Sequence, residues 1–216
     1  TCYYGGVSGY SFTASEEKKE QEETVSKAFK MAKASANAAS LKLNFRKRPA
    51  VKSRKTDTLP IGIHPRTKDL SYKTDMVNRV VDTAREFGKN ISNISAAYGE
   101  LYGQKLFTNS EGSNVDWNFE VVDLRCTVVS KTETGDLVEG EGFTGGTIGL
   151  ELFNKKGSKP EDIGKEAGTN AKEQLEAKAC PAGKFRALIE NHLTGVLAHE
   201  SFGHLSEGDF VVTDAS

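Results

Sequence analysis

The stretch FEVVDLRCTVVSK, which runs from Phe119 to Lys131, decides the fold class of this 216-residue chain. It is rich in β-branched residues and alternates in part between apolar and polar side chains, which is typical of a strand with one face buried in a sheet. Residues 134–136 form a turn, and residues 137–153 continue as a strand interrupted by glycines, which predict bulges or the close approach of another backbone. On the other side, residues 96–112 indicate two short strands with a glycine corner.

Long helices flank these strands. Before them, apolar residues at helical spacing predict a helix with one buried face: Val77, Val80, Val81, Ala84, Phe87 and Ile91. After them, Ser158 and Glu161 have the spacing of a capping box, with Pro160 in the first turn. The expected face of the helix that follows consists of Ile163, Ala167, Ala171 and Leu175. Another capping box, from Thr13 to Glu16, predicts a long helix with an apolar face of Val25, Phe29, Ala32 and Ala36. The prediction is an α+β fold, with long helices packed on mixed or antiparallel sheets.

Composition excludes several classes of protein. Lys and Arg number 29 and Asp and Glu 30, so a net charge of −1 gives no strong field for nucleic acid or an anionic membrane. No apolar run approaches the roughly 20 residues that cross a bilayer, and the chain does not open with a signal-peptide pattern. Cys2, Cys126 and Cys180 are too scattered for a disulfide framework, which favours a reducing, cytoplasmic location.

Basic residues gather between Lys42 and Lys55 with little apolar content. A basic stripe can contact nucleic acid, but no aromatic residue suited to base stacking lies between Arg46 and Lys55. We therefore favour a solvated linker between domains, and expect no nucleic acid as a partner.

The most suggestive motif, HESFGHLSEGD, runs from His199 to Asp209. A breaker at 180–183, an expected short buried strand at 185–189 and a predicted N-cap at Asn191 place the motif on a last helix near the C-terminal end. It begins like the zinc-hydrolase signature H-E-x-x-H, but its second histidine comes one residue late. Zinc hydrolases need neutral imidazole ligands, an open coordination position and a carboxylate close to the attacking water.

The extra residue determines whether the two histidines can share an ion. On a regular α-helix, residues five apart lie about 140° apart around the axis, so His199 and His204 would point to different sides. A π-bulge with i→i+5 bonds brings the fifth residue back near the first, and Gly203 is where such a deformation costs least. Two interpretations stay open from the residues alone: a zinc site on a π-bulge, or two ordinary histidines at a helix end.

Four other polar residues need an interpretation. His192 shares a helical face with His199 but lies two turns, about 10 Å, away, so we expect a structural or surface histidine rather than a ligand. His64 lies near two prolines and is expected to be exposed to solvent. Glu207 and Asp209 either orient a ligand imidazole or are charged residues at a helix end, with neither interpretation preferred.

HESFGHLSEGD resembles the H-E-x-x-x-H stretch of the TldD/PmbA family, the metallopeptidases also called modulators of DNA gyrase. Other segments are similar to that family in the same order along the chain: YYGGVSGYSFTAS at 3–15, FTNSEG at 107–112, GFTGG at 142–146, and CPAGK with FRALI at 180–189. The resemblance covers most of the chain. It implies the end of an N-terminal α/β domain at 1–45, a basic linker at 46–70, a central α+β domain at 71–178, and the start of a C-terminal metallopeptidase domain at 179–216.

The resemblance also implies chemistry. His199 and His204 match the two histidine ligands of a zinc ion, and Glu200 matches the glutamate that acts as general base on the zinc-bound water. The family's third ligand is a cysteine expected beyond residue 216, so we expect the chain to be a fragment that is inactive alone.

Partners and substrates follow from the same resemblance. It implies unfolded or flexible peptides as substrates, and either a homodimer or a heterodimer with a PmbA-like subunit. The alternative is a non-catalytic subunit that serves dimerisation or interaction. The intact His199, Glu200 and His204 triplet argues against it, because such a subunit has no need of these residues.

Overall fold

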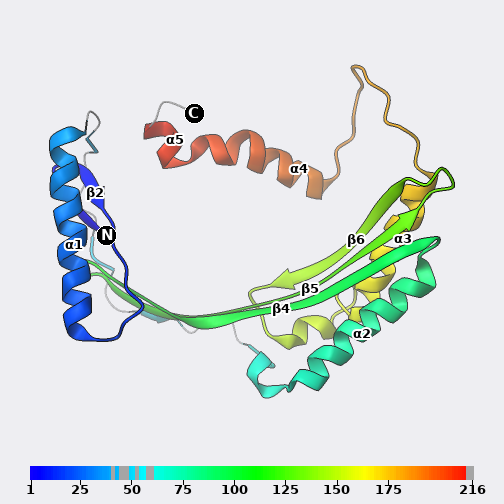
Figure 1. Cartoon of the computed structure of the whole chain (residues 1–216), viewed down its shortest axis with the longest axis horizontal. Helices are drawn as coiled ribbons and strands as arrows, with labels where there is room; N and C mark the ends of the chain where they lie inside the picture. Colours follow the sequence, from blue (N-terminus) through cyan, green and yellow to red (C-terminus); the bar gives the residue numbers. More distant parts are fainter. Residues whose placement is uncertain (40–41, 44–48, 52–53, 57–60, 213–216) are drawn as a thin grey trace. The chain divides into compact units, whose positions relative to one another are not determined.

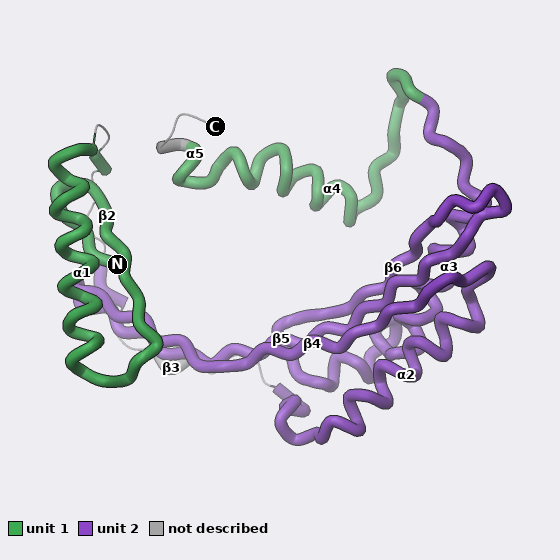
Figure 2. The backbone as a smooth tube through the Cα atoms, viewed as in Figure 1, with its two compact units in different colours: residues 1–48, 182–216 green, residues 49–181 purple. Residues whose placement is uncertain are grey.

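The computed structural model describes residues 1–39, 42–43, 49–51, 54–56 and 61–212. Contacts divide the chain into two compact units, one of residues 1–48 and 182–216 and the other of residues 49–181 (Figure 2). Within this described part, no helix combines the length and the apolar character that crossing a bilayer requires. The four segments expected from the sequence stay predictions, and the expected linker at 46–70 lies partly outside the described residues.

The central unit is built on one sheet around β5 (Asn114–Lys131). Strand β4 (Ile91–Thr108) pairs antiparallel with β5 along its length, with Tyr102 opposite Glu120. Strand β6 (Leu137–Gly146) pairs antiparallel with the C-terminal half of β5, and the short β3 (Arg54–Thr56) pairs parallel with its start. The strand predicted from the opening stretch is therefore the central strand of a mixed sheet, which confirms the α+β class.

Two helices cover one face of this sheet, α2 (Leu70–Phe87) and α3 (Pro160–Glu176) (Figure 1). Alternate residues of β5 point into the core beneath them, and the buried apolar ones are Val122, Leu124, Cys126 and Val128. The buried side chains of the two helices are Met76, Val80, Ala84, Ile163, Ala167 and Ala171. Full burial of a Val or Leu side chain contributes about 1.5–3 kcal/mol, so burial of this face stabilises the central unit. The predicted faces of both helices are confirmed except at two positions: Phe87 is 37% exposed, and Ile91 lies in β4 because α2 ends at Phe87.

Glycines on β6 let the sheet and α3 approach closely. A Cβ atom on Gly140 would lie 2.0 Å from the backbone nitrogen of Ala171, and one on Gly142 would lie 2.3 Å from the carbonyl oxygen of Ile163. Real Cβ atoms do not make such contacts, so the backbones meet only because these residues lack side chains. The predicted close approach of another backbone is confirmed.

The glycine corner predicted within residues 96–112 is wrong. Strand β4 runs through Gly99 and Gly103 without a break. A Cβ on Gly99 would lie 2.2 Å from Oδ2 of Asp123, and one on Gly103 would lie 3.0 Å from the ring of Phe119. These glycines make room for side chains of the neighbouring strand, and the chain turns only at residues 109–113.

The first residues form a hairpin of β1 (Cys2–Tyr4) and β2 (Val7–Gly9), joined by Gly5 and Gly6 at positive φ as a tight hairpin turn requires. Helix α1 (Lys18–Ala38) packs on the hairpin through Ala28, Ala32 and Ala36. Val25 and Phe29, predicted to share this buried face, are 62% and 45% exposed.

Neither predicted capping box forms. Helix α1 begins only after Glu17, whose amide donates to Oγ of Ser15. At the start of α3, Asp162 rather than Glu161 accepts from the backbone, through the amides of Gly157 and Lys159. Both helices nevertheless form where expected, because their apolar faces outweigh the exact cap.

Candidate metal centre

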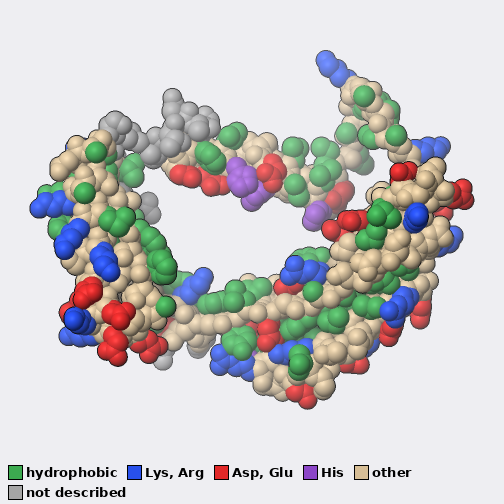
Figure 3. Space-filling view, viewed as in Figure 1, with side chains coloured by type: hydrophobic (Ala, Val, Ile, Leu, Met, Phe, Trp, Pro, Cys, Tyr) green, Lys and Arg blue, Asp and Glu red, His purple; other side chains and the backbone are tan. Residues whose placement is uncertain are grey.

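The motif lies on a short helical segment. Helix α4 (Asn191–Ala198) is capped by Glu190, whose Oε1 accepts from the amide of Leu193 at 2.8 Å, one residue before the predicted cap. The predicted buried strand at 185–189 is wrong, since these residues have no regular structure and are exposed. Histidine side chains lie exposed beside acidic ones along this segment (Figure 3).

The helix changes its winding at the motif. Residues His199–Gly203 form a π-helical turn, and the amide of His204 donates to the carbonyl oxygen of His199, five residues back. The turn brings the rings of His199 and His204 to a centroid distance of 4.5 Å at an angle of 75°. The π-bulge predicted from the spacing is confirmed.

Gly203 is not what makes the turn possible. Its φ of −59° and ψ of −56° are helical. A Cβ atom there would meet the carbonyl oxygen of Ala198 at 3.8 Å and Nδ1 of His199 at 3.9 Å, which are ordinary contacts. The interpretation that glycine eases the backbone at this position is therefore wrong, because any helix-forming residue can adopt these angles.

The turn gathers one ligand-type atom each from His199, Glu200 and His204, and all three lie within 4.8 Å of one another. Nε2 of His204 lies 3.6 Å from Oε2 of Glu200. Glu207 contacts the other ring nitrogen, with its Oε1 2.5 Å from Nδ1. The hydrogen bond to Glu207 raises the pKa of His204 above its ordinary value.

The chemistry of these three residues fits a zinc site. Imidazoles are ligands of a catalytic zinc, and a carboxylate beside them can act on the attacking water. Ligand atoms of a tetrahedral zinc lie roughly 3.3 Å apart, given bonds of about 2.0–2.1 Å, so small side-chain rotations close the group around an ion. His192 is exposed and stands outside the group, as expected. The roles of His199, Glu200, His204 and Asp209 stay predictions.

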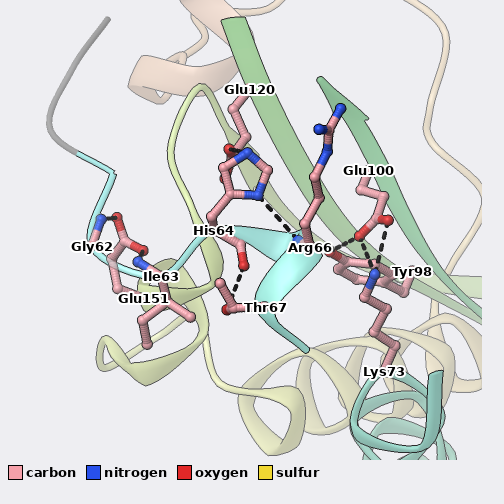
Figure 4. A network of polar contacts seen from close by, with 10 residues as sticks. All are labelled: Gly62, Ile63, His64, Arg66, Thr67, Lys73, Tyr98, Glu100, Glu120 and Glu151. Atoms are coloured by element: carbon pink, nitrogen blue, oxygen red, sulfur yellow. Dashed lines mark hydrogen bonds and ion pairs between the residues drawn. The ribbon is translucent and has the colours of Figure 1, made fainter. Parts of the chain in front are cut away.

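A second group of polar contacts lies in the central unit and was missed from the sequence (Figure 4). The side chain of Glu120 is 1% exposed, and its Oε2 lies 3.0 Å from Nε2 of His64. The amide of Arg66 donates to Nδ1 of His64 at 3.0 Å, so Nε2 carries the proton that faces the carboxylate. Burial raises the pKa of Glu120, and His64 opposes this. The side chain of His64 is 40% exposed, in line with the expected solvent exposure, and only its contact with buried Glu120 was not expected.

The same group ties residues 62–67 to the sheet through Glu120 and to the 3-10 helix at Leu150–Asn154 through Glu151. Glu151 accepts from the amides of Gly62 and Ile63 at 2.8 and 2.7 Å. Near His64, Glu100 accepts from Tyr98 and Lys73, and these bonds outweigh burial and hold the pKa of Glu100 below its ordinary value. One pattern in the sequence points to this group: the alternation of β5 places Glu120 on the core-facing side of the strand.

Comparison with known proteins defines the class. A family model described as the PmbA/TldA metallopeptidase central domain matches residues 63–175, more than half of the chain. The chain therefore belongs to the PmbA/TldD family of metallopeptidases, as the resemblance of its motifs indicated.

Particular relatives agree with this. A metalloprotease of Methanocaldococcus jannaschii is 31% identical over 212 residues, covering 96% of this chain and 45% of that protein. A metalloprotease TldD homolog of Haemophilus influenzae is 30% identical over 141 residues, covering 64% of this chain and 29% of that protein. The chain thus spans less than half the length of each of these relatives.

Two solved structures named as modulators of DNA gyrase share the fold. The match to the protein from Bacteroides thetaiotaomicron has a TM-score of 0.66 at 14% identity, and it covers 86% of this chain and 41% of that protein. The match to the protein from Thermotoga maritima has a TM-score of 0.54 at 18% identity, and it covers 79% of this chain and 36% of that protein. At these identities the likeness shows the fold alone.

Proposed function

We propose that the complete protein is a zinc-dependent metallopeptidase that hydrolyses unfolded or flexible peptides. The π turn carries this proposal, because it brings His199, Glu200 and His204 together although their spacing forbids this on a regular helix. The relatives named as metalloproteases support it. The histidines hold the ion in this proposal, and a third protein ligand is expected from a cysteine beyond residue 216.

The residues have distinct tasks in this proposal. A bound zinc supplies Lewis acidity, which polarises the scissile carbonyl and lowers the pKa of a water molecule. Glu200 takes a proton from the attacking water and passes it to the leaving amine. Its side chain is 62% exposed in this segment, so a flexible peptide can reach it.

A non-catalytic subunit of a TldD/PmbA-type complex is the second candidate. Such a subunit needs the dimer interface but not the triplet, so the close grouping of two histidines and a glutamate favours the enzyme. We propose that the enzyme acts as a homodimer or as a heterodimer with a PmbA-like subunit, in the cytoplasm.

Metal binding by the complete protein tests the proposal. We expect His199→Ala and His204→Ala each to weaken zinc binding by more than about 100-fold, because losing a ligand exceeds the 10–100-fold effect of losing an outer-shell partner. His192→Ala is the matched control: it removes an exposed histidine on the same helix outside the group, and should change the affinity by less than about threefold. Zinc content after dialysis and competition with a chelator measure the affinities. Equal behaviour of all three variants would remove the histidines from the site.

A further inference from the structure

Glu207 makes two hydrogen bonds with His204, one through its side chain and one through its backbone. Its carboxylate Oε1 lies 2.5 Å from Nδ1 of the imidazole. Its amide donates to the carbonyl oxygen of His204 at 3.1 Å, which closes the 3-10 turn η4 (His204–Ser206). The backbone hydrogen bond positions Glu207 so that its carboxylate can reach Nδ1 of His204. The carboxylate therefore holds the imidazole ring from the side opposite Glu200.

The contact also determines which nitrogen carries the proton. An ionised carboxylate can only accept a hydrogen bond, so Nδ1 of His204 must be the donor. In a neutral imidazole the lone pair is then on Nε2. Nε2 is the nitrogen that lies toward Glu200, 3.6 Å from its Oε2. The free lone pair of the ring therefore faces Glu200, which groups with both histidines.

Glu207 itself stands outside that position. The group of ligand-type atoms within 4.8 Å of one another contains His199, Glu200 and His204 but not Glu207. Glu207 lies on the opposite ring nitrogen, and to bind the ion directly it would have to give up that hydrogen bond.

We propose that Glu207 is a positioning residue, which holds His204 in the tautomer and orientation that bind the metal through Nε2. This rests on the proposed function, since it assumes that His204 is a ligand. A carboxylate behind a ligand histidine raises the basicity of that ligand, and losing it costs about 10–100-fold in metal affinity.

The test compares zinc affinity across Glu207 variants of the complete protein. We expect Glu207→Ala to weaken zinc binding about 10–100-fold and Glu207→Gln to weaken it less, because the amide oxygen can still accept from Nδ1. Glu173→Ala, at an exposed glutamate on α3, is the control and should leave the affinity unchanged. The thermal unfolding midpoint of each variant is measured alongside, and should stay close to that of the unsubstituted protein.

A double-mutant cycle separates positioning from a general structural effect. If Glu207 acts through His204, then Glu207→Ala adds little further loss of zinc affinity in a His204→Ala background. An unchanged affinity in Glu207→Ala, or the same loss in both backgrounds, would overturn the proposal while His199 and His204 remain ligands. If the unsubstituted protein does not bind zinc, or binds it independently of both histidines, the proposed function fails first and this proposal fails with it.

Discussion

Glu200→Gln is expected to lower the rate of peptide cleavage by the complete protein by about 10²–10⁴-fold while zinc stays bound. General acid–base catalysis by a positioned side chain contributes this range, and an amide cannot take the proton of the attacking water. The substitution keeps the shape of the side chain and leaves His199 and His204 in place. Cleavage of an unstructured peptide under single-turnover conditions measures the loss, and metal analysis of the same sample measures the zinc.

Glu173→Gln on α3 is the matched control, since it removes one exposed carboxylate of the same type and should leave the cleavage rate unchanged. Full activity of Glu200→Gln would remove Glu200 from the mechanism. Loss of zinc together with activity would make Glu200 a ligand rather than the general base.

Gly140→Ala is expected to destabilise the central unit by roughly 3 kcal/mol, the upper part of the range for an overpacked contact. The added Cβ would lie 2.0 Å from the backbone nitrogen of Ala171 and 2.4 Å from the carbonyl oxygen of Ala167. Backbone atoms inside a packed helix cannot move aside as a flexible side chain can, so β6 and α3 must separate. The thermal unfolding midpoint should fall by roughly 6–12 °C for a protein of this size.

Gly146→Ala is the control on the same strand. Its Cβ would meet only a methyl group of Ile148, at 3.4 Å, so its stability should stay within about 0.5 kcal/mol of the unsubstituted protein. Equal midpoints for Gly140→Ala and Gly146→Ala would show that β6 does not approach α3 as described.

The fold was predictable where one element alone carries the pattern. The alternation within Phe119–Lys131 predicted a half-buried strand, and the helical spacing predicted the buried faces of α2 and α3. The long strand β4 could not be predicted, because Gly99 and Gly103 are explained only by the side chains of Asp123 and Phe119 opposite them. Strand register depends on both paired segments, so the sequence of one segment alone does not determine it.

The candidate site divides in the same way. The π turn was one of two interpretations that the spacing of His199 and His204 left open, and it could be foreseen because the geometry of a helix is local. The contact of Glu207 with His204 was one of two open interpretations, since residue types alone do not determine a side-chain rotamer. The pairing of Glu120 with His64 was missed, because it joins segments far apart in sequence and depends on the folded sheet.

X-ray absorption at the zinc edge of the complete protein is the most direct test of the central claim, that the π turn lets His199 and His204 bind one ion. We predict scattering from two imidazole rings per zinc, at Zn–N distances of about 2.0–2.1 Å. His199→Ala and His204→Ala should each remove the scattering of one zinc-bound imidazole ring, and His192→Ala should leave the scattering of both rings unchanged. A spectrum without imidazole scattering, or one that neither the His199 nor the His204 substitution changes, would contradict the account.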